Sequence, residues 1–303
     1  NNMFGALEFS EKVSSVGVQP IIGCNLKIKT PKNYLHENIE EEDLHFFLNI
    51  FSKNEVGYKN LLNIISSAYM NHKENASVDV ETLFNNKEGL LVLSGGNNSI
   101  LKYSNNNIIT DQSFSFISDF KNKFMDNFYL EIQRIGGSDY RIDEEVILNL
   151  AYDNHIPIVA TNDVYFEGPD YYEAHDALMC IERKLFVSQK DRKRLSSNHY
   201  FKSQREMKEL FSDIPEALLN TIEIAQRCSH RPKIKMPVLP SFHSDNRQEK
   251  IILNELSHKG LRQNLFQKFK VEEIPENIQS KIKKEYEERL EKELKIITDM
   301  KYE

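Results

Sequence analysis

The chain has 303 residues, of which 39 are basic and 46 acidic, so its formal net charge is -7. A content of 40% hydrophobic and 28% charged residues is typical of a folded globular protein and excludes a disordered or fibrous one. The acidic balance argues against a general nucleic-acid clamp, because contacts to phosphates require positive charge.

A chain of this length exceeds a typical single core, so we expect two domains, or one large domain with an appendage. Helical and strand patterns alternate as far as residue 166. The stretch 44–51 is almost continuously apolar, which suggests a strand buried on both faces, as in parallel sheets. Repeated units of this kind imply an α/β fold with parallel strands and right-handed crossovers. Five strands are predicted, at 18–30, 44–51, 89–96, 128–135 and 156–166, with helices at 3–17, 57–71, 115–127 and 143–155.

Beyond residue 166 the pattern is helical. Helices are predicted at 169–183 and 203–228, and Pro215 suits the first turn of a helix inside the second stretch. The segment 231–246 contains prolines and no periodicity, which indicates a linker. Two charged helices, at 248–269 and 276–300, follow it.

Ligands of parallel sheets gather where the strands end, so few residues are candidates for chemistry. Asp163 is the one acid among them and none is a histidine, whereas a hydrolytic metal site needs several such side chains. His175 follows the last strand by one loop and could face the site, although a packing histidine is the alternative. The candidates are Cys24, Asn25, Phe51, Ser52, Ser94, Arg134, Ile135, Asn162, Asp163 and Tyr165.

A basic segment follows the helix at 169–183. It could contact a phosphate backbone, but a solvated loop is the favoured alternative, because no interleaved aromatic platform accompanies it in the sequence. Its acids are Glu182 and Asp191, and its basic residues are Arg183, Lys184, Lys190, Arg192, Lys193 and Arg194.

The remaining signals concern the compartment of the protein. No apolar run approaches the roughly 18 residues that span a bilayer, and the first residues, NNMFGALEF, carry no secretory leader. Cys24, Cys180 and Cys228 form no CxxC pair, which argues against a zinc ribbon and a disulfide framework. We expect a cytoplasmic protein without membrane partners that is a piece of a longer chain.

Several long strings together resemble one family. NMFGALEFSEKVSSVGVQPIIGC, VGYKNLLNIISSAY, GLLVLSGG, IPIVATNDVYF and HYFKSQREMKELFSDIPEALLNTIEIAQRC are similar to the amino-terminal region of bacterial replicative DNA polymerases, the DNA polymerase III alpha subunits. The resemblance extends to YEERLEKELKIITDMKYE, which is similar to the family's entry into the palm domain. It therefore covers nearly all of the chain.

The resemblance implies a PHP (polymerase and histidinol phosphatase) domain, a distorted seven-stranded α/β barrel, of which five strands are present here. It also implies a domain at 1–232, a linker at 233–246 and a helical segment at 247–303 that leads to the palm. The expected role is a structural, partner-binding module of a DNA-directed DNA polymerase in chromosomal replication. The implied partners are DNA and other polymerase subunits, above all the proofreading exonuclease.

The same resemblance allows the family's metal positions to be compared with this chain. Asn25, Phe47, Ile135 and Tyr165 stand where family members with an intact site have an acid or a histidine, and Asp163 alone keeps its acid. Because the four replacements are poor ligands, we expect a vestigial site, inactive in this segment, that binds no cofactor. His45, two positions before Phe47, faces the same side of its strand and is one substitute ligand. Magnesium would serve the parent polymerase, and a metal-dependent phosphoesterase or 3'-5' proofreading exonuclease is the alternative function.

Overall fold

The computed structural model describes two compact units of the chain, Asn1–Ile234 and Lys235–Glu303. The described residues are 2–31, 45–71, 76–96, 101, 111–136, 144–189, 191–192, 194–234, 236 and 249–302.

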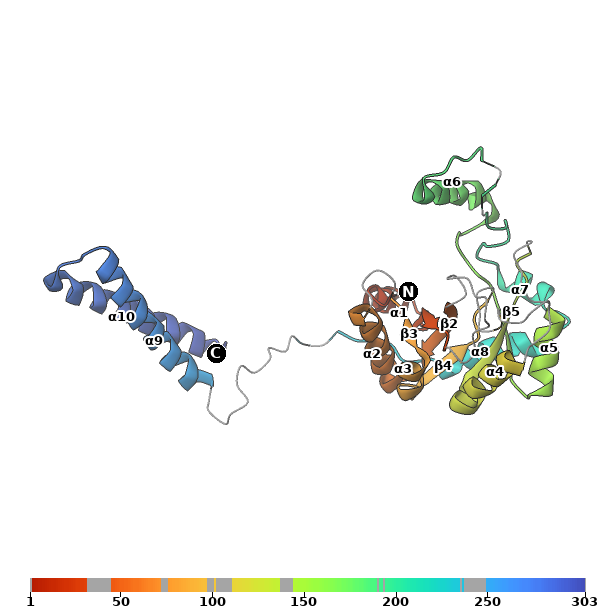
Figure 1. The fold of residues 1–303 in the computed structure, drawn as a ribbon, viewed down its shortest axis with the longest axis horizontal. Coiled ribbons are helices and arrows are strands. Elements are labelled where there is room, and N and C mark those ends of the chain that lie inside the picture. Colours follow the sequence, from red (N-terminus) through yellow and green to blue (C-terminus); the bar gives the residue numbers. More distant parts are fainter. Residues whose placement is uncertain are drawn as a thin grey trace. The chain divides into compact units, whose positions relative to one another are not determined.

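The first unit is built on a mixed sheet (Figure 1). The order of its six described strands is β3-β1-β2-β4-β5-β6. The α/β class and the five predicted strands are confirmed, and the sixth, β3, is too short to have been recognised from its sequence. The strands are β1 (Gly23–Lys29), β2 (His45–Ser52), β3 (Val78–Asp79), β4 (Leu90–Leu93), β5 (Phe128–Gln133) and β6 (Ile158–Thr161).

The orientation predicted for the second strand is wrong. β2 runs antiparallel to both β1 and β4, whereas β4, β5 and β6 are parallel to one another. Burial along β2 alternates between buried and half-buried residues, so the strand is not buried on both faces. Phe46 and Phe47 fall on opposite faces of the strand, and this made both faces look equally apolar in the sequence.

The main core lies between one face of the sheet and the helices that follow its strands. Leu48 and Ile50 of β2 and Phe128 of β5 are fully buried there, and Phe46 of β2 packs edge to face against Phe116 of the helix layer at 5.4 Å between ring centroids. The helices that supply this layer are α2 (Glu55–Asn71), α3 (Val80–Asn85), α4 (Asp111–Phe124), which continues into a 3-10 turn (Met125–Asn127), and α5 (Glu144–Asp153).

Two glycines allow α2 to pack closely against the start of β4. A Cβ atom on Gly57 would lie 1.9 Å from the carbonyl oxygen of Gly89, and Gly89 itself has a φ of +71°. Any larger side chain at either position would push the helix off the sheet.

The first helix presents an unusual face to the domain. α1 (Ala6–Ser15) buries Ser10, whose hydroxyl has no hydrogen-bond partner among the described residues, while Phe4, Leu7 and Phe9 are exposed. A surface helix normally does the reverse, because burying apolar side chains is favourable. These apolar side chains, on and just before α1, are therefore exposed to solvent in the described structure.

Helices after β6 complete the first unit. α8 (Pro215–Arg227) begins at Pro215 as predicted and packs Ile224 against the opposite sheet face. α7 (Gln204–Leu210) begins with a capping box formed by Ser203 and Glu206. A short 3-10 turn (Pro169–Tyr171) and α6 (Tyr172–Arg183) form an excursion between β6 and α7, and the chain returns through a parallel bridge between Phe166 and Tyr200.

The described strands do not close into a barrel. β3 and β6 are the two edges of the sheet as described, so the seven-stranded barrel implied by the resemblance is not confirmed. What is established is an open, mixed sheet with helices.

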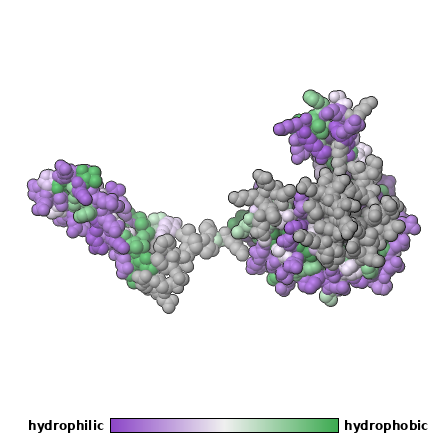
Figure 2. Space-filling model, viewed as in Figure 1, coloured by the Kyte–Doolittle hydropathy of each residue, from purple (hydrophilic) through white to green (hydrophobic). Residues whose placement is uncertain are grey.

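The second unit contains two packed helices. α9 (Glu249–Val271) and α10 (Glu276–Asp299) lie where the sequence predicts two charged helices. Their surface is largely hydrophilic (Figure 2), and Ile252, Leu265 and Leu294 are buried. Among the described residues, no helix is both long and apolar enough to cross a membrane.

Candidate functional site

Polar side chains from separate strands meet on the sheet face opposite the main core. Asn25 of β1 lies across from Asn49 of β2 in the antiparallel register, and its Nδ2 donates to Asn49 Oδ1 at 2.8 Å. Asn49 Nδ2 donates in turn to the two carboxylate oxygens of Glu131 on β5, at 3.0 and 3.3 Å. We call Asn25, Asn49, Glu131, Gln133 and Thr161 the Glu131 network.

Glu131 is the centre of this network and is only 3% exposed. Its carboxylate also accepts hydrogen bonds from Gln133 Nε2 at 2.9 Å and from the hydroxyl of Thr161. Burial raises the pKa of Glu131, and the hydrogen bonds from Thr161, Asn49 and Gln133 oppose that rise. Both oxygens are therefore already engaged by protein donors, as expected of a structural carboxylate rather than of an open metal ligand.

The raised pKa of Glu131 predicts a pH dependence of stability. The folded state binds the Glu131 proton more tightly than the unfolded state, so this group's stabilising contribution is complete below its ordinary pKa and is lost as pH rises through the folded value. Urea unfolding of the wild type and of Glu131→Gln from pH 5 to pH 8 should show the wild type losing stability relative to the variant. A difference that does not change with pH would contradict the raised pKa.

The structure places the predicted metal positions in different surroundings. Asn25 is part of the Glu131 network. Phe47 lies on the same face of β2 as His45 and Asn49, half-buried. Ile135, just beyond β5, is 3% exposed, and its carbonyl accepts a hydrogen bond from Ser196 Oγ at 2.6 Å. Two of these positions thus offer apolar side chains to the place where ligands are expected.

Asp163 and Tyr165 lie beyond the end of β6, next to a histidine that sequence reasoning passed over. His199 is buried, with its Nε2 4.0 Å from Asp163 Oδ2 and its Nδ1 3.0 Å from the carbonyl of Ser196. Burial raises the pKa of Asp163, and the nearby His199 opposes that rise. The ring of Tyr165 lies between His175 and His199, at 5.7 and 5.6 Å between centroids.

These side chains do not amount to a metal centre. Within the described residues, no three histidine, cysteine, aspartate or glutamate side chains are placed to hold one ion. Among the described residues, Asp163 and His199 are a pair without a third such partner, and Glu131 is already engaged by donors. The residues that the structure describes therefore do not form the set of ligands that a multi-metal cluster needs.

Sequence reasoning missed Glu131 and His199 for different reasons. Glu131 lies inside the apolar strand FYLEIQ, and only strand ends were considered as candidates. An acid within such a strand is itself a signal, because it must find donors if it is buried. His199 shows no metal-ligand spacing, and its position depends on the return of the excursion to β6.

Arg134, which the sequence places at a strand end, has a structural role. Its guanidinium binds Glu144 at the start of α5 and Asp213 before α8, and it stacks on the ring of Phe211 at 4.9 Å. The carboxylates of Glu144 and Asp213 raise the pKa of Arg134 above its ordinary value.

Two arginines of the basic segment form ion pairs within the protein. The guanidinium of Arg192 forms a bidentate pair with Asp176 of α6, and both side chains are 3% exposed. The hydrogen bonds from Arg192 lower the pKa of Asp176. Arg194 lies 3.2 Å from the same carboxylate, and its guanidinium lies over the ring of Tyr172. Arg192 is therefore a poor candidate for a phosphate contact.

The other residues of that segment differ in their availability. Arg183 and Lys184 are exposed at the end of α6, where Lys184 adopts a left-handed backbone. Lys190 and Lys193 lie outside the described residues. Contact of this segment with DNA stays a prediction, and the geometry favours Arg183 and Lys184 to make it.

Comparison with known proteins finds one family model and several relatives that are similar to this chain. Residues 1–135 match the model of the PHP domain. The DNA polymerase III subunit alpha of Caulobacter vibrioides is 38% identical over 267 residues, covering 87% of this chain and 23% of that protein. Those of Rickettsia felis and Vibrio cholerae are 34% and 35% identical over 99% of the chain.

The chain spans about a quarter of the length of these relatives, 23%, 24% and 25% respectively. The match extends over both units of the chain, since the Rickettsia felis protein aligns with 99% of it. Residues 1–135 therefore belong to the PHP domain family, and the chain as a whole is a homologue of the matching quarter of DNA polymerase III alpha subunits.

Proposed function

We propose that this chain is a structural, partner-binding PHP module of a replicative DNA polymerase and that it has no working metal cluster. The observation that carries the proposal is the Glu131 network, in which protein donors take up the carboxylate on the face where ligands are expected. Apolar Phe47 and Ile135 at two further positions support it.

The activity proposed for the parent protein is DNA-directed DNA polymerisation, because the relatives are named DNA polymerase III subunit alpha. Magnesium would be its cofactor. Its partners would be DNA and the other polymerase subunits, with the proofreading exonuclease first among them. We place the protein in the cytoplasm, without a membrane partner.

The finer architecture is also a proposal. In the longer polypeptide the open sheet would become the distorted seven-stranded barrel, followed by a linker at 233–246 and a segment at 247–303 entering the palm. The support is the exposure of Phe4, just before α1, and of Leu7 and Phe9 within it, which further elements of the chain would bury.

The competing function is a metal-dependent phosphoesterase or 3'-5' exonuclease, and the Asp163–His199 pair favours it. Metal analysis by plasma mass spectrometry, after dialysis against a weak chelator, decides between the two. We expect far less than one zinc, manganese or iron ion per chain, both for the 303-residue chain and for the longer polypeptide.

A stoichiometry of about two ions per chain would contradict the proposal. In that case Asp163→Asn and His199→Gln should each release metal, whereas the matched exposed variants Asp170→Asn and His155→Gln should not. Retained metal in all four variants would direct attention to ligands outside the described residues.

A further inference from the structure

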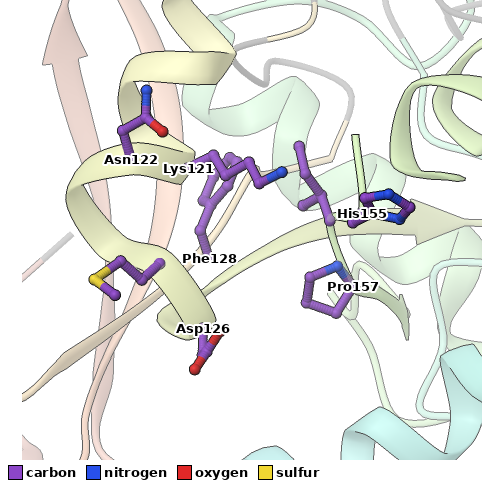
Figure 3. A pocket seen from close by; sticks show the side chains of 8 residues that line it. Lys121, Asn122, Asp126, Phe128, His155 and Pro157 are labelled. Atoms are coloured by element: carbon purple, nitrogen blue, oxygen red, sulfur yellow. The ribbon is translucent and has the colours of Figure 1, made fainter. Parts of the chain in front are cut away.

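A pocket of about 410 Å³ (Figure 3) lies at one end of the strands, and Asp163 and His199 lie at the opposite end. Phe128 begins β5, and Pro157 immediately precedes β6, so the pocket is at the amino ends of these parallel strands. Phe128, Ile156 and Pro157 form an apolar floor, in which Phe128 is fully buried and Ile156 is 5% exposed, so the accessible apolar surface comes from Pro157 and from the neighbouring Met125. None of these residues belongs to the Glu131 network.

Charge is distributed unevenly around the floor. Lys121 and His155 lie at one end of the pocket and Asp126 at the other (Figure 3). Lys121 Nζ donates to the carbonyl of Asn154, and no carboxylate of the described residues forms an ion pair with it. An apolar ligand group with a carboxylate beside it would therefore complement the Lys121 end.

Two backbone positions at the rim are costly. Met125 and His155 are non-glycine residues with left-handed backbones, at φ values of 52° and 51°, and both line this pocket. Each follows the end of a helix, where glycine is the residue normally favoured. The side chain of Met125 is 68% exposed beside the apolar floor. Exposed methionine is common at surfaces that bind apolar groups, because it is flexible and polarisable.

We propose that this pocket docks an acidic segment of a protein partner. An apolar side chain of the segment lies on Pro157 against Met125, and an adjacent carboxylate lies near Lys121. The inference deepens the proposed partner-binding role and rests on it. Since the pocket is at the edge opposite Asp163, docking leaves that end of the sheet accessible.

The test uses methyl-13C-methionine NMR on the 303-residue chain, with Met125 assigned among its seven methionines by Met125→Leu. The probes are three blocked dipeptides: acetyl-Phe-Asp-amide, acetyl-Phe-Lys-amide and acetyl-Ala-Asp-amide. Saturable shifts of the Met125 methyl group are expected with the first, and affinity at least about fivefold lower with the other two. Equal affinity for the Phe-Asp and Phe-Lys probes, or no shift with any probe, would overturn the proposal.

Lys121→Met should weaken binding of the Phe-Asp probe about fivefold. Lys123→Met is the matched control, because Lys123 is on the same helix but does not line the pocket. The other methionine signals report whether each variant is folded. If Lys121→Met does not fold, His155→Ala provides the second test of the pocket. Metal content tests the scaffold role separately. A metal-free chain that does not bind the probe would contradict only the proposed docking pocket. A metal-bound chain that binds the probe would contradict only the proposed scaffold role.

Discussion

Replacing Glu131 with alanine is expected to lower the free energy of unfolding by about 3 kcal/mol, because buried donors would lose their shared acceptor. Asn49 Nδ2, Gln133 Nε2 and the Thr161 hydroxyl all point at this carboxylate. Gln133 and Thr161 can still bond to each other, at 3.1 Å, and this limits the loss. The expected fall in the unfolding midpoint is roughly 6–12 °C, measured by calorimetry.

The matched control is Glu131→Gln, which keeps one acceptor oxygen and the side-chain volume. It should cost about 1 kcal/mol or less at neutral pH, since it also removes a buried charge. A double-mutant cycle with Asn49→Ala should then give a coupling energy of about 1–2 kcal/mol, because the two side chains are in direct contact. Equal losses for the alanine and glutamine variants would mean that the sheet needs the full carboxylate, because the glutamine variant keeps the side-chain volume and one acceptor oxygen.

Much of the fold is predictable from local pattern, and most of the site is not. Apolar periodicity places α2 and α5, and Pro215 places the start of α8, because each signal lies within one element. The direction of β2 depends on its neighbours, and no residue within it encodes that direction. Single hydrogen bonds of the Glu131 network join residues up to 82 positions apart, from Asn49 to Glu131, so no spacing rule would have revealed the network.

The resemblance predicts which metal positions have been lost, but not what occupies them. Asn25 was expected to be a weak ligand, and its amide instead donates to Asn49 and so continues the chain of hydrogen bonds to Glu131. The basic segment shows the same limit. Its sequence contains six basic residues, at 183–194, but does not reveal that Arg192 is paired with Asp176. Partner choice within the fold, rather than composition, decides which charges remain free.

Replacing Arg134 with alanine is expected to destabilise the first unit by about 2–3 kcal/mol, because one side chain joins three elements. Its Nε donates to Glu144 at 2.8 Å, and its Nη atoms reach Asp213 at 2.6 and 2.7 Å. Nη1 also donates to the carbonyl of Leu210 at 2.5 Å, at the end of α7. Removing the guanidinium therefore releases the end of β5, the start of α5 and the turn before α8 together.

Hydrogen exchange distinguishes this clamp from simple packing. In Arg134→Ala, the amides of α7 and of the first turn of α8 should lose protection, while those of α2 should change only as global stability changes. Arg134→Met keeps the aliphatic stem but removes the guanidinium that lies over Phe211, so it should recover only the packing part of the loss. Arg134→Lys keeps the charge but cannot bind Glu144 and Asp213 at once in the forked geometry, so it should remain less stable than the wild type. Full recovery by lysine would show that charge alone suffices, and Arg134 would then be a simple counter-ion rather than a clamp.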